Sequence, residues 1–320
     1  MARGDSVVGR RSREDRLLGH VQHPDRYVES LLESRGEPVA LSVWQASQPT
    51  QAVVFVPGTA VHPLFYEEFL DALAANGRTV VGLHPQGHGR SPRVSRVLRW
   101  DDLVGNAIDA TRWAADTFGL PIVLVGSSQG SLVALLAAAA EPSAVQGVIA
   151  HNLFDPNDPD AVMVTRFGTA QPVQQLARRV LDAAARITPR APVRITAYLD
   201  PRRVFGAPWT RELFERDPLV LRSYPLRFVA DLAGVDTRSL YDGSLAVPVT
   251  VLAARGDPLF PLAGIEAVAH RLVASSVDLV VLDTDCHLVL NEAVDLAVPV
   301  VLEALHRMSA TAGSASGAAR

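Results

Sequence analysis

One serine lies at the centre of a G-x-S-x-G pentad, Gly126–Gly130, between two stretches of different character. The β-branched run 121–125 precedes the pentad, and the small-residue run 131–140 follows it. A strand, a sharp strained turn and a helix in this order form a nucleophile elbow, which exposes the serine hydroxyl at its apex. Glycine on either side of the serine avoids collisions with the turn and the helix. The pattern therefore predicts that Ser128 is a nucleophile.

A serine nucleophile needs a general base, and the base needs an orienting carboxylate. Asp257 follows the predicted strand 249–253, and His287 follows the predicted strand 277–282. Parallel strands end at one edge of a sheet, so both side chains are expected at the edge where Ser128 emerges. We therefore predict that His287 is the general base and that Asp257 orients it.

Other residues are weighed against this triad. Asp155 follows the predicted strand 147–150 and stays open as an alternative acid. Cys286 adjoins His287 without an elbow of its own, which disfavours a thiol nucleophile. The remaining polar residues near these motifs are interpreted as bracing, capping or hinge residues. They are His62, His84, His88, Asp285, His151 and Asn152. For His151 and Asn152, a position facing the substrate is equally possible.

Composition excludes several classes of function. The chain is 48% hydrophobic with a mean hydropathy of +0.16, as in globular proteins. Its 320 residues are enough for one large domain with an insertion or for two small domains. A net charge of −4 offers no basic surface for nucleic acid. All 30 basic residues are arginine, which excludes Schiff-base and phosphate-loop lysines. The single cysteine excludes an intrachain disulfide and a multi-cysteine metal cluster.

The chain shows no pattern of a membrane span or a secretion signal. The apolar run 132–140 ends at Glu141, well short of a span, and residues 1–18 are polar and arginine-rich without an apolar core. We therefore expect a cytoplasmic protein. The sequence does not indicate an oligomeric state.

Strand and helix patterns alternate along most of the chain, which predicts an α/β fold with a parallel sheet and helices on both faces. The predicted strands are 26–33, 39–44, 52–56, 79–83, 121–125, 147–150, 249–253 and 277–282, and the predicted helices of this part are 63–75, 101–118, 131–140, 262–274 and 291–307. Between the two parts of the sheet, the sequence is mostly helical and rich in proline, with helices expected over 171–187, 210–216 and 225–232. We interpret this insertion as a cap over the edge of the sheet that binds ligands.

The predicted elements divide the chain into four parts. They are a flexible arm over 1–24, a core over 25–151 and 247–308, a helical cap over 152–246, and a disordered Ala/Ser/Gly-rich tail over 309–320.

These motifs resemble those of the α/β-hydrolase superfamily, and the resemblance covers roughly residues 38–307. The segments that resemble family motifs are Gly256–Pro261 for the acid loop, Cys286–His287 for the histidine loop and 84–91 for the D-x-x-G-x-G-x-S turn. In the cap, the tetrapeptide Asp217–Val220 is similar to that of the lysophospholipase and monoacylglycerol-lipase branch. The resemblance implies the α/β-hydrolase fold, with a mostly parallel central sheet, flanking helices and an inserted cap. It also implies ester hydrolysis without a metal or an organic cofactor.

An oxyanion hole needs backbone N–H groups directed at the developing charge. Gln129, directly after the nucleophile, supplies one of them. The second is expected from the loop after strand 52–56, where the family usually carries His-Gly-x. This chain has Pro57 in place of that histidine, and Thr59 is the expected donor. Ser131 also departs from the glycine or alanine of many relatives.

The predicted function is therefore hydrolysis of a small-molecule carboxylic ester through an acyl-enzyme on Ser128. Hydrolysis of a thioester, lactone, amide or C–C bond stays open, as does a binding protein that has lost catalysis. The predicted cap contains many apolar residues, which predicts a preference for medium or long hydrophobic substrates. These residues are Val162, Met163, Phe167, Leu176, Val180, Phe205, Trp209, Leu213, Phe214, Leu219 and Leu221.

Overall fold

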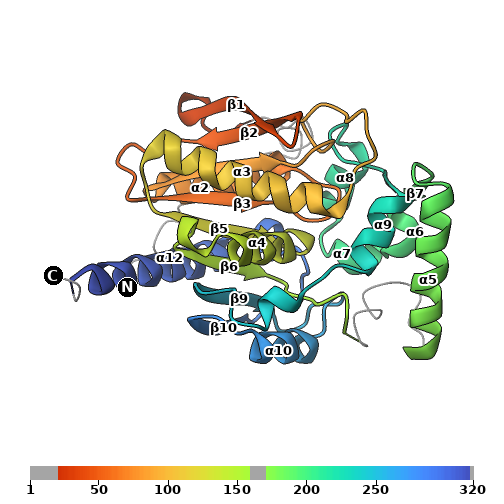
Figure 1. The fold of residues 1–320 in the computed structure, drawn as a ribbon. Helices are drawn as coiled ribbons and strands as arrows, with labels where there is room; N and C mark the ends of the chain where they lie inside the picture. Colours follow the sequence, from red (N-terminus) through yellow and green to blue (C-terminus); the bar gives the residue numbers. More distant parts are fainter. Residues whose placement is uncertain (1–20, 159–170, 318–320) are drawn as a thin grey trace.

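A computed structural model describes residues 21–158 and 171–317. An eight-stranded sheet forms its centre, in the order β1-β2-β4-β3-β5-β6-β9-β10 (Figure 1). The strands are β1 (Tyr27–Ser34), β2 (Glu37–Trp44), β3 (Gln51–Val56), β4 (Arg78–His84), β5 (Ile122–Ser127), β6 (Gly147–His151), β9 (Pro248–Ala254) and β10 (Ser276–Leu282). Strands β4, β3, β5, β6, β9 and β10 run parallel, whereas β2 is antiparallel to both of its neighbours. The predicted α/β-hydrolase fold class is confirmed.

Helices cover both faces of the sheet. The flanking helices are α2 (Glu67–Ala75), α3 (Trp100–Phe118), α4 (Gln129–Ala140), α10 (Leu262–Arg271), α11 (Val289–Glu292) and α12 (Val294–Gly317). Helices α3, α4 and α10 contribute to one buried apolar cluster, and α2 and α12 to a second (Figure 1). The central strands β3 and β5 are buried along their whole length, which explains their near-continuous apolar sequences. None of the described helices has both the length and the apolar sequence needed to cross a membrane.

The ends of the chain differ from the sequence-based expectation. Residues 1–20 of the predicted flexible arm lie outside the described residues, and Gln22 and His23 are held by contacts with α2. The helix predicted over 291–307 is two helices, α11 and α12, and α12 continues to Gly317, where we predicted a disordered tail. Alanine and serine after Ser309 are compatible with a helix, since alanine has the highest helix propensity.

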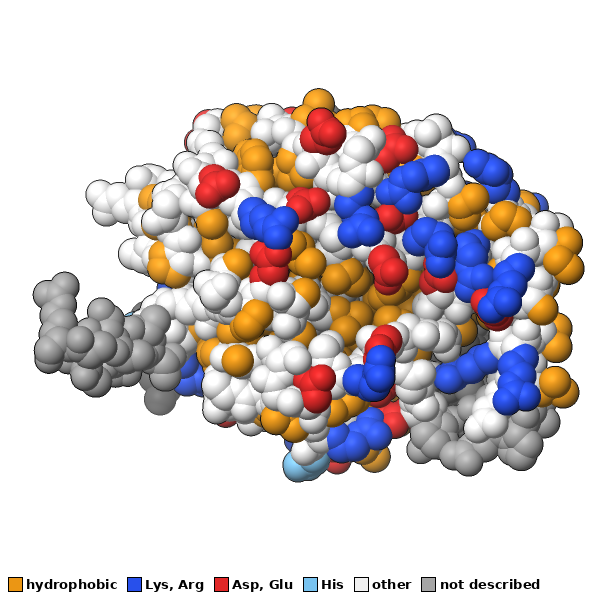
Figure 2. All heavy atoms as spheres, viewed as in Figure 1, with side chains coloured by type: hydrophobic (Ala, Val, Ile, Leu, Met, Phe, Trp, Pro, Cys, Tyr) orange, Lys and Arg blue, Asp and Glu red, His pale blue; other side chains and the backbone are white. Residues whose placement is uncertain are grey.

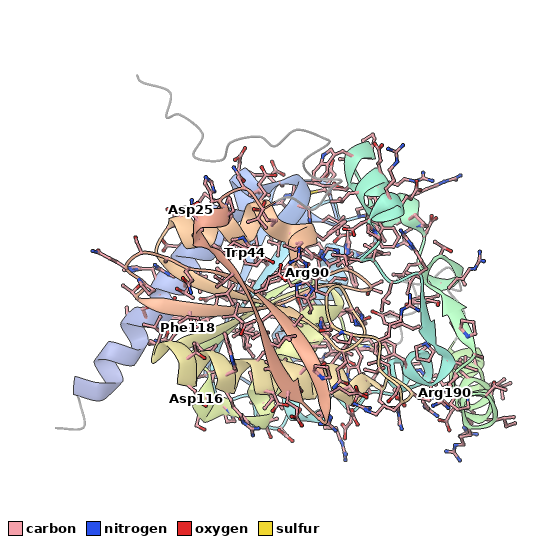
Figure 3. The ribbon with its side chains drawn as sticks, turned by 90° about the horizontal axis from the view of Figure 1, so that it is seen from above. Asp25, Trp44, Arg90, Asp116, Phe118 and Arg190 are labelled. Carbon is pink, nitrogen blue, oxygen red and sulfur yellow. The ribbon has the colours of Figure 1, made fainter. Side chains whose placement is uncertain are left out.

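The inserted segment lies at the end of the sheet where the parallel strands finish (Figure 1). Its elements are α5 (Gln171–Ile187), β7 (Pro192–Arg194), α6 (Ile195–Tyr198), α7 (Pro201–Val204), α8 (Pro208–Arg216), β8 (Ser223–Pro225) and α9 (Leu226–Ala233). We missed the antiparallel pair of β7 and β8, because strands of three residues are too short to show an alternating pattern. Viewed from above, Arg190 of this segment lies far from Asp116 and Phe118 at the end of α3 (Figure 3).

Polar contacts join this segment, hereafter the cap, to the core. His62 Nε2 lies 2.9 Å from Asp217 Oδ2, and both side chains are buried. Arg99, directly before α3, pairs with Asp231 of α9. Figure 2 shows arginine and acidic side chains interspersed on the face of the molecule that it draws. Because exposed ion pairs contribute roughly 0–1 kcal/mol, we expect the buried His62–Asp217 pair to matter more for cap attachment.

The His62–Asp217 contact predicts a pH-dependent contribution to stability. Burial by itself raises the pKa of Asp217, but the hydrogen bond and charge of His62, together with the Leu219 N–H and the Arg222 charge, outweigh burial and hold this pKa below its usual value. A carboxylate with a depressed pKa in the folded state stabilises the fold above its unfolded pKa of about 3.9, and the contribution is lost as the pH falls through the folded value.

We therefore expect Asp217→Asn to lower the free energy of unfolding by about 1–3 kcal/mol at pH 7. The difference from wild type should shrink as the pH falls from 5 to 3. Urea unfolding at several pH values measures both effects, with Asp116→Asn on the exposed face of α3 as the control. A difference that stays constant down to pH 3 would show that the Asp217 charge does not contribute.

Candidate active site

Ser128 occupies the turn between β5 and α4 in a strained backbone conformation. Its φ of 53° and ψ of −119° are rare for a residue with a side chain, and its N–H donates to the carbonyl of His151 at 2.8 Å. A Cβ at Gly126 would collide with the backbone of Gly130, and a Cβ at Gly130 would collide with the backbone of Val56. Both glycines are therefore required by close packing, and the turn has the shape of a nucleophile elbow.

Asp257 and His287 meet at the ends of β9 and β10. His287 Nδ1 lies 2.9 Å from Asp257 Oδ2, and both side chains are buried. Asp257 Oδ1 accepts hydrogen bonds from the N–H groups of Leu259 at 2.7 Å and Phe260 at 3.0 Å. Burial raises the pKa of Asp257, but the His287 charge and these hydrogen bonds outweigh burial, so its pKa lies below the usual value. An ionised Asp257 favours the tautomer with Nδ1 protonated, which leaves His287 Nε2 free to accept a proton.

The His287 ring is fixed on its other sides as well. Phe260 stacks on the imidazole with ring centroids 5.2 Å apart, and Asn152 Nδ2 donates to the His287 carbonyl at 2.8 Å. Asn152 has a positive φ of 60°, which turns the chain after β6 toward the histidine loop. Asn152 therefore supports the histidine loop. The sequence alone had left its role open between a hinge residue and a residue facing the substrate.

Asp155, the alternative acid, has other partners. Its carboxylate accepts hydrogen bonds from Tyr241 Oη at 2.7 Å, from Thr237 Oγ1 at 3.2 Å and from the N–H of Asn157 at 2.9 Å. Within the described part of the chain it makes no contact with His287. The geometry therefore brings Asp257, and not Asp155, to the candidate base.

Ser128 and His287 line one cavity of about 570 Å³ beneath the cap. Ser128 is partly exposed, and its Oγ makes no hydrogen bond with any described residue. Most of the lining is apolar, and it includes Phe205 and Phe214 from our predicted cap residues.

Other predicted cap residues do not line the cavity. Leu176 and Val180 face solvent with about 60% of their surface exposed, and residues 162, 163 and 167 lie outside the described residues. We missed the other cap residues of the lining, among them Ile195, Leu199, Val204, Val229 and Leu232, because no motif marks them.

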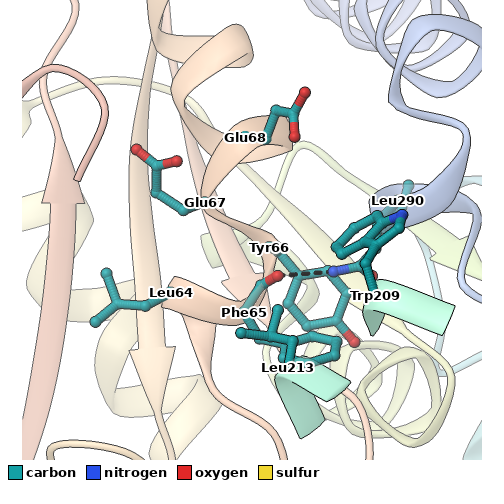
Figure 4. A pocket seen from close by; sticks show the side chains of 9 residues that line it. Leu64, Phe65, Tyr66, Glu67, Glu68, Trp209, Leu213 and Leu290 are labelled. Atoms are coloured by element: carbon teal, nitrogen blue, oxygen red, sulfur yellow. Dashed lines mark hydrogen bonds between the residues drawn. The ribbon is translucent and has the colours of Figure 1, made fainter. Parts of the chain in front are cut away.

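A second cavity, between the core and α8, is much smaller. It measures about 20 Å³ and is lined by Phe65, Tyr66, Trp209 and Leu213, among others (Figure 4). Asn291 Nδ2 donates to the Phe65 carbonyl at 2.7 Å beside it. A volume of this size holds about one water molecule, so this cavity is not a substrate site.

The loop after β3 contains Thr59, whose N–H the sequence analysis predicts as the second oxyanion donor. The N–H of Gly58 donates to Tyr66 Oη at 3.3 Å, and the N–H of Ala60 donates to Tyr224 Oη at 2.9 Å. The N–H of Thr59, between these two, has no acceptor among the described residues. The Thr59 hydroxyl, Oγ1, donates to Oε1 of Gln129 at 3.1 Å. Thr59 and Gln129 both line the cavity beside Ser128. Gln129 is the first residue of α4, so no carbonyl one turn earlier in the helix takes its N–H.

The cap contacts the loop after β3 that contains Thr59. Tyr224 Oη contacts the N–H of Ala60 and lies 2.7 Å from His88 Nε2, and the N–H of Leu221 donates to the Ala60 carbonyl at 2.9 Å. Ala60 has a left-handed φ of 66°, a conformation that these contacts help to maintain. Sequence reasoning missed Tyr224, because a cap tyrosine outside any motif carries no signal of this role.

Burial lowers the pKa values of three further histidines, His84, His88 and His151, so these side chains stay uncharged near neutral pH. Burial lowers the pKa of His88 to about 4 and the pKa of His151 to about 3, with the nearby His287 adding to the effect on His151. His84 contacts Ser42 Oγ through Nε2 and accepts from the N–H of Arg90 through Nδ1, so it braces its glycine turn as predicted.

Cys286 is not suited to act as a nucleophile. Burial raises the pKa of the Cys286 thiol above 9.0, so the thiol stays protonated and a poor nucleophile. In the described part of the chain, no group of three or more histidine, cysteine, aspartate or glutamate side chains has an arrangement suited to a metal ion. The cavity beside Ser128 is therefore the candidate active site.

Fold and site together define an α/β hydrolase with the elements of a serine hydrolase. The family model described as "Serine aminopeptidase, S33" matches residues 47–294, more than half of the chain. The protein therefore belongs to this α/β-hydrolase family. No curated protein matches the chain.

Solved structures with the same fold include several lipases. A monoacylglycerol lipase from Paleococcus ferrophilus is 20% identical with a TM-score of 0.66, and the match covers 84% of this chain and 99% of that one. A lipase in its open form is 20% identical with a TM-score of 0.72, over 88% of this chain and 99% of that one. A soluble variant of monoglyceride lipase from Saccharomyces cerevisiae is 16% identical with a TM-score of 0.61, and the match covers 79% of this chain and 85% of that one. At these identities the likeness concerns the fold.

Proposed function

We propose that this protein hydrolyses carboxylic esters with an apolar acyl or alcohol chain. The observation that carries the proposal is the cavity of about 570 Å³, in which Ser128 and His287 are the reactive groups of a mostly apolar lining. A candidate nucleophile and base in a cavity whose lining is otherwise mostly apolar suit a substrate that has one polar reacting bond and a hydrocarbon chain.

The proposed reaction has two halves. Ser128 Oγ attacks the ester carbonyl carbon while His287 Nε2 takes the hydroxyl proton, and the tetrahedral oxyanion accepts hydrogen bonds from the N–H groups of Thr59 and Gln129. Collapse of this intermediate breaks the bond to the alcohol, which leaves with the proton from His287. Water, deprotonated by His287, then attacks the acyl-enzyme and releases the carboxylic acid and free Ser128.

Asp257 acts through His287. Its carboxylate holds the imidazole in the required tautomer and stabilises the imidazolium of each half-reaction. The contacts of Asp257 with Leu259 and Phe260 support this role, because they keep the carboxylate ionised and fixed although it is buried.

The proposal predicts a preference for longer chains. Each methylene buried in the cavity should gain about 0.8 kcal/mol, which is roughly three- to fourfold in kcat/KM. A series of p-nitrophenyl esters from acetate to decanoate at one pH measures this dependence. If acetate is the best substrate and kcat/KM falls steadily with chain length, the substrate does not occupy the apolar cavity and the proposed substrate class is wrong.

A further inference from the structure

Three consecutive residues of the loop after β3 differ in what their backbone N–H groups contact. The N–H of Gly58 donates to Tyr66 Oη. The N–H of Ala60 donates to Tyr224 Oη. The N–H of Thr59, between them, has no acceptor among the described residues, and Thr59 lines the cavity. Two tyrosine hydroxyls thus take the neighbouring N–H groups and leave the one that the proposed mechanism directs at the oxyanion.

Tyr224 belongs to the cap, and its ring is fixed at the boundary between cap and core. It lies in β8, is buried, and stacks on Phe228 of α9 with ring centroids 4.2 Å apart. Phe228 in turn packs against Trp100 of the core helix α3, with ring centroids 6.1 Å apart. The position of the Tyr224 hydroxyl therefore depends on how the cap sits on the core.

The direction of the Tyr224 hydroxyl is fixed as well. His88 Nδ1 lies 3.0 Å from the carbonyl oxygen of Gln86, which can only accept, so Nδ1 carries the proton of the neutral ring. Nε2 of the same ring is then an acceptor and lies 2.7 Å from Tyr224 Oη. The Tyr224 hydroxyl therefore donates to His88, and its oxygen accepts from the N–H of Ala60.

Ala60 needs such partners because its backbone conformation is unfavourable. Its φ of 66° lies in the left-handed region, which disfavours a residue with a Cβ. The cap binds both backbone groups of Ala60, since Leu221 donates its N–H to the Ala60 carbonyl at 2.9 Å. Peptide units are rigid planes, so the contacts that hold Ala60 also limit the orientation of the adjacent peptide unit with the Thr59 N–H.

We propose that Tyr224 is a positioning residue for the oxyanion hole, and that its hydroxyl holds Ala60 so that the Thr59 N–H is directed at the developing oxyanion. The inference rests on the proposed function and adds a cap residue to catalytic machinery that otherwise comes from the core. Tyr224 does not line the cavity, so its loss should affect the transition state and not the binding of the apolar chain.

Steady-state kinetics of Tyr224→Phe with p-nitrophenyl octanoate is the first test. Both half-reactions pass through a tetrahedral oxyanion, so kcat should fall and KM should change little. We expect kcat to fall about tenfold, less than the roughly 10²- to 10³-fold loss of a deleted oxyanion donor, because the Thr59 N–H is still present but less well directed. A kcat equal to that of wild type in the folded variant would overturn the inference. Thermal unfolding checks that the variant is folded.

Two ketones of equal chain length separate the transition state from chain binding. In octyl trifluoromethyl ketone, the electron-poor carbonyl carbon forms a bond with Ser128 Oγ, whose proton passes to His287, and the carbonyl oxygen becomes an oxyanion. Methyl octyl ketone binds without this addition. Tyr224→Phe should raise Ki of the fluorinated ketone by the factor by which kcat/KM falls, and leave Ki of the other unchanged. Equal rises for both ketones would mean that only the cavity has been disturbed, and would overturn the inference.

Two variants of His88 test the same network while Tyr224 stays in place. His88→Leu removes the acceptor of the Tyr224 proton, whereas His88→Gln keeps a side-chain oxygen that can accept it. We expect His88→Leu to lower kcat and raise Ki of the fluorinated ketone, and His88→Gln to restore most of both. Equal losses in the two variants would count against the inference, because the direction of the Tyr224 hydroxyl would then not matter.

Tyr27→Phe is the matched control. It removes a tyrosine hydroxyl that contacts Ser42 Oγ at 2.7 Å on the edge strand β1, so it should change neither kcat nor either Ki. A wild-type enzyme that does not hydrolyse the octanoate ester would refute the proposed function and the inference with it. Hydrolysis that is equally fast in wild type and Tyr224→Phe would refute the inference alone.

Discussion

Ser128→Ala should lower kcat for ester hydrolysis by roughly 10⁶-fold, the largest effect expected of any substitution in this protein. The change removes the atom that attacks the carbonyl in the proposed mechanism and leaves the cavity and the proposed oxyanion donors in place. His287→Ala should cost a similar factor, because without a base the hydroxyl of Ser128 is a weak nucleophile. Steady-state kinetics with p-nitrophenyl octanoate measures both losses.

The double variant tests whether the two residues act as one unit. Ser128→Ala combined with His287→Ala should be little worse than either single change, since each already abolishes the shared proton transfer. Losses that multiply would count against a common step. Thermal unfolding of each variant checks that the lost activity does not reflect a lost fold.

Asp257→Asn should lower kcat by about 10⁴-fold, the second largest effect. An amide at this position no longer stabilises the imidazolium, and its NH₂ group favours the tautomer with the wrong nitrogen protonated. The hydrogen bond of 2.9 Å between Asp257 Oδ2 and His287 Nδ1 is the contact that is changed.

Asp155→Asn is the matched comparison for this variant. Asp155 is buried like Asp257 but contacts Tyr241 and Thr237, so its replacement should affect stability more than kcat. A nearly silent Asp257→Asn beside a crippling Asp155→Asn would mean that the acid has been assigned to the wrong strand.

The sequence was sufficient to predict the fold and the proximity of Asp257 and His287. The elbow around Ser128, and the positions of Asp257 and His287 after their strands, follow from local patterns that the chain carries in short segments. Parallel pairing of β9 with β10 then brings Asp257 and His287 together, because neighbouring parallel strands end at the same edge of the sheet.

The contacts of the cap could not be predicted in the same way. Tyr224 reaches Ala60 across 164 positions of the chain, and His62 reaches Asp217 across 155. A contact between segments so far apart depends on how the cap packs, and no local pattern reports that packing. Our expectation that His62 serves at a helix start was incomplete for this reason, since its backbone precedes the short helix at Pro63 while its side chain binds the cap.

The apolar residues of the cap were only partly assigned for a related reason. The sequence shows that Phe205, Phe214, Leu176 and Val180 are apolar, but it does not show which of them face the cavity. In the structure the two phenylalanines line the cavity, whereas Leu176 and Val180 are exposed on α5. The substrate preference therefore has to be argued from the folded cap.

Labelling with a fluorophosphonate probe tests the central claim, an activated Ser128, most directly. The probe forms a covalent bond only with a serine whose hydroxyl is activated, and peptide mass spectrometry locates the adduct. We expect one adduct, on Ser128, that is absent in Ser128→Ala and forms far more slowly in His287→Ala. An unlabelled Ser128 in the folded wild-type protein would contradict the account and favour a binding protein that has lost catalysis.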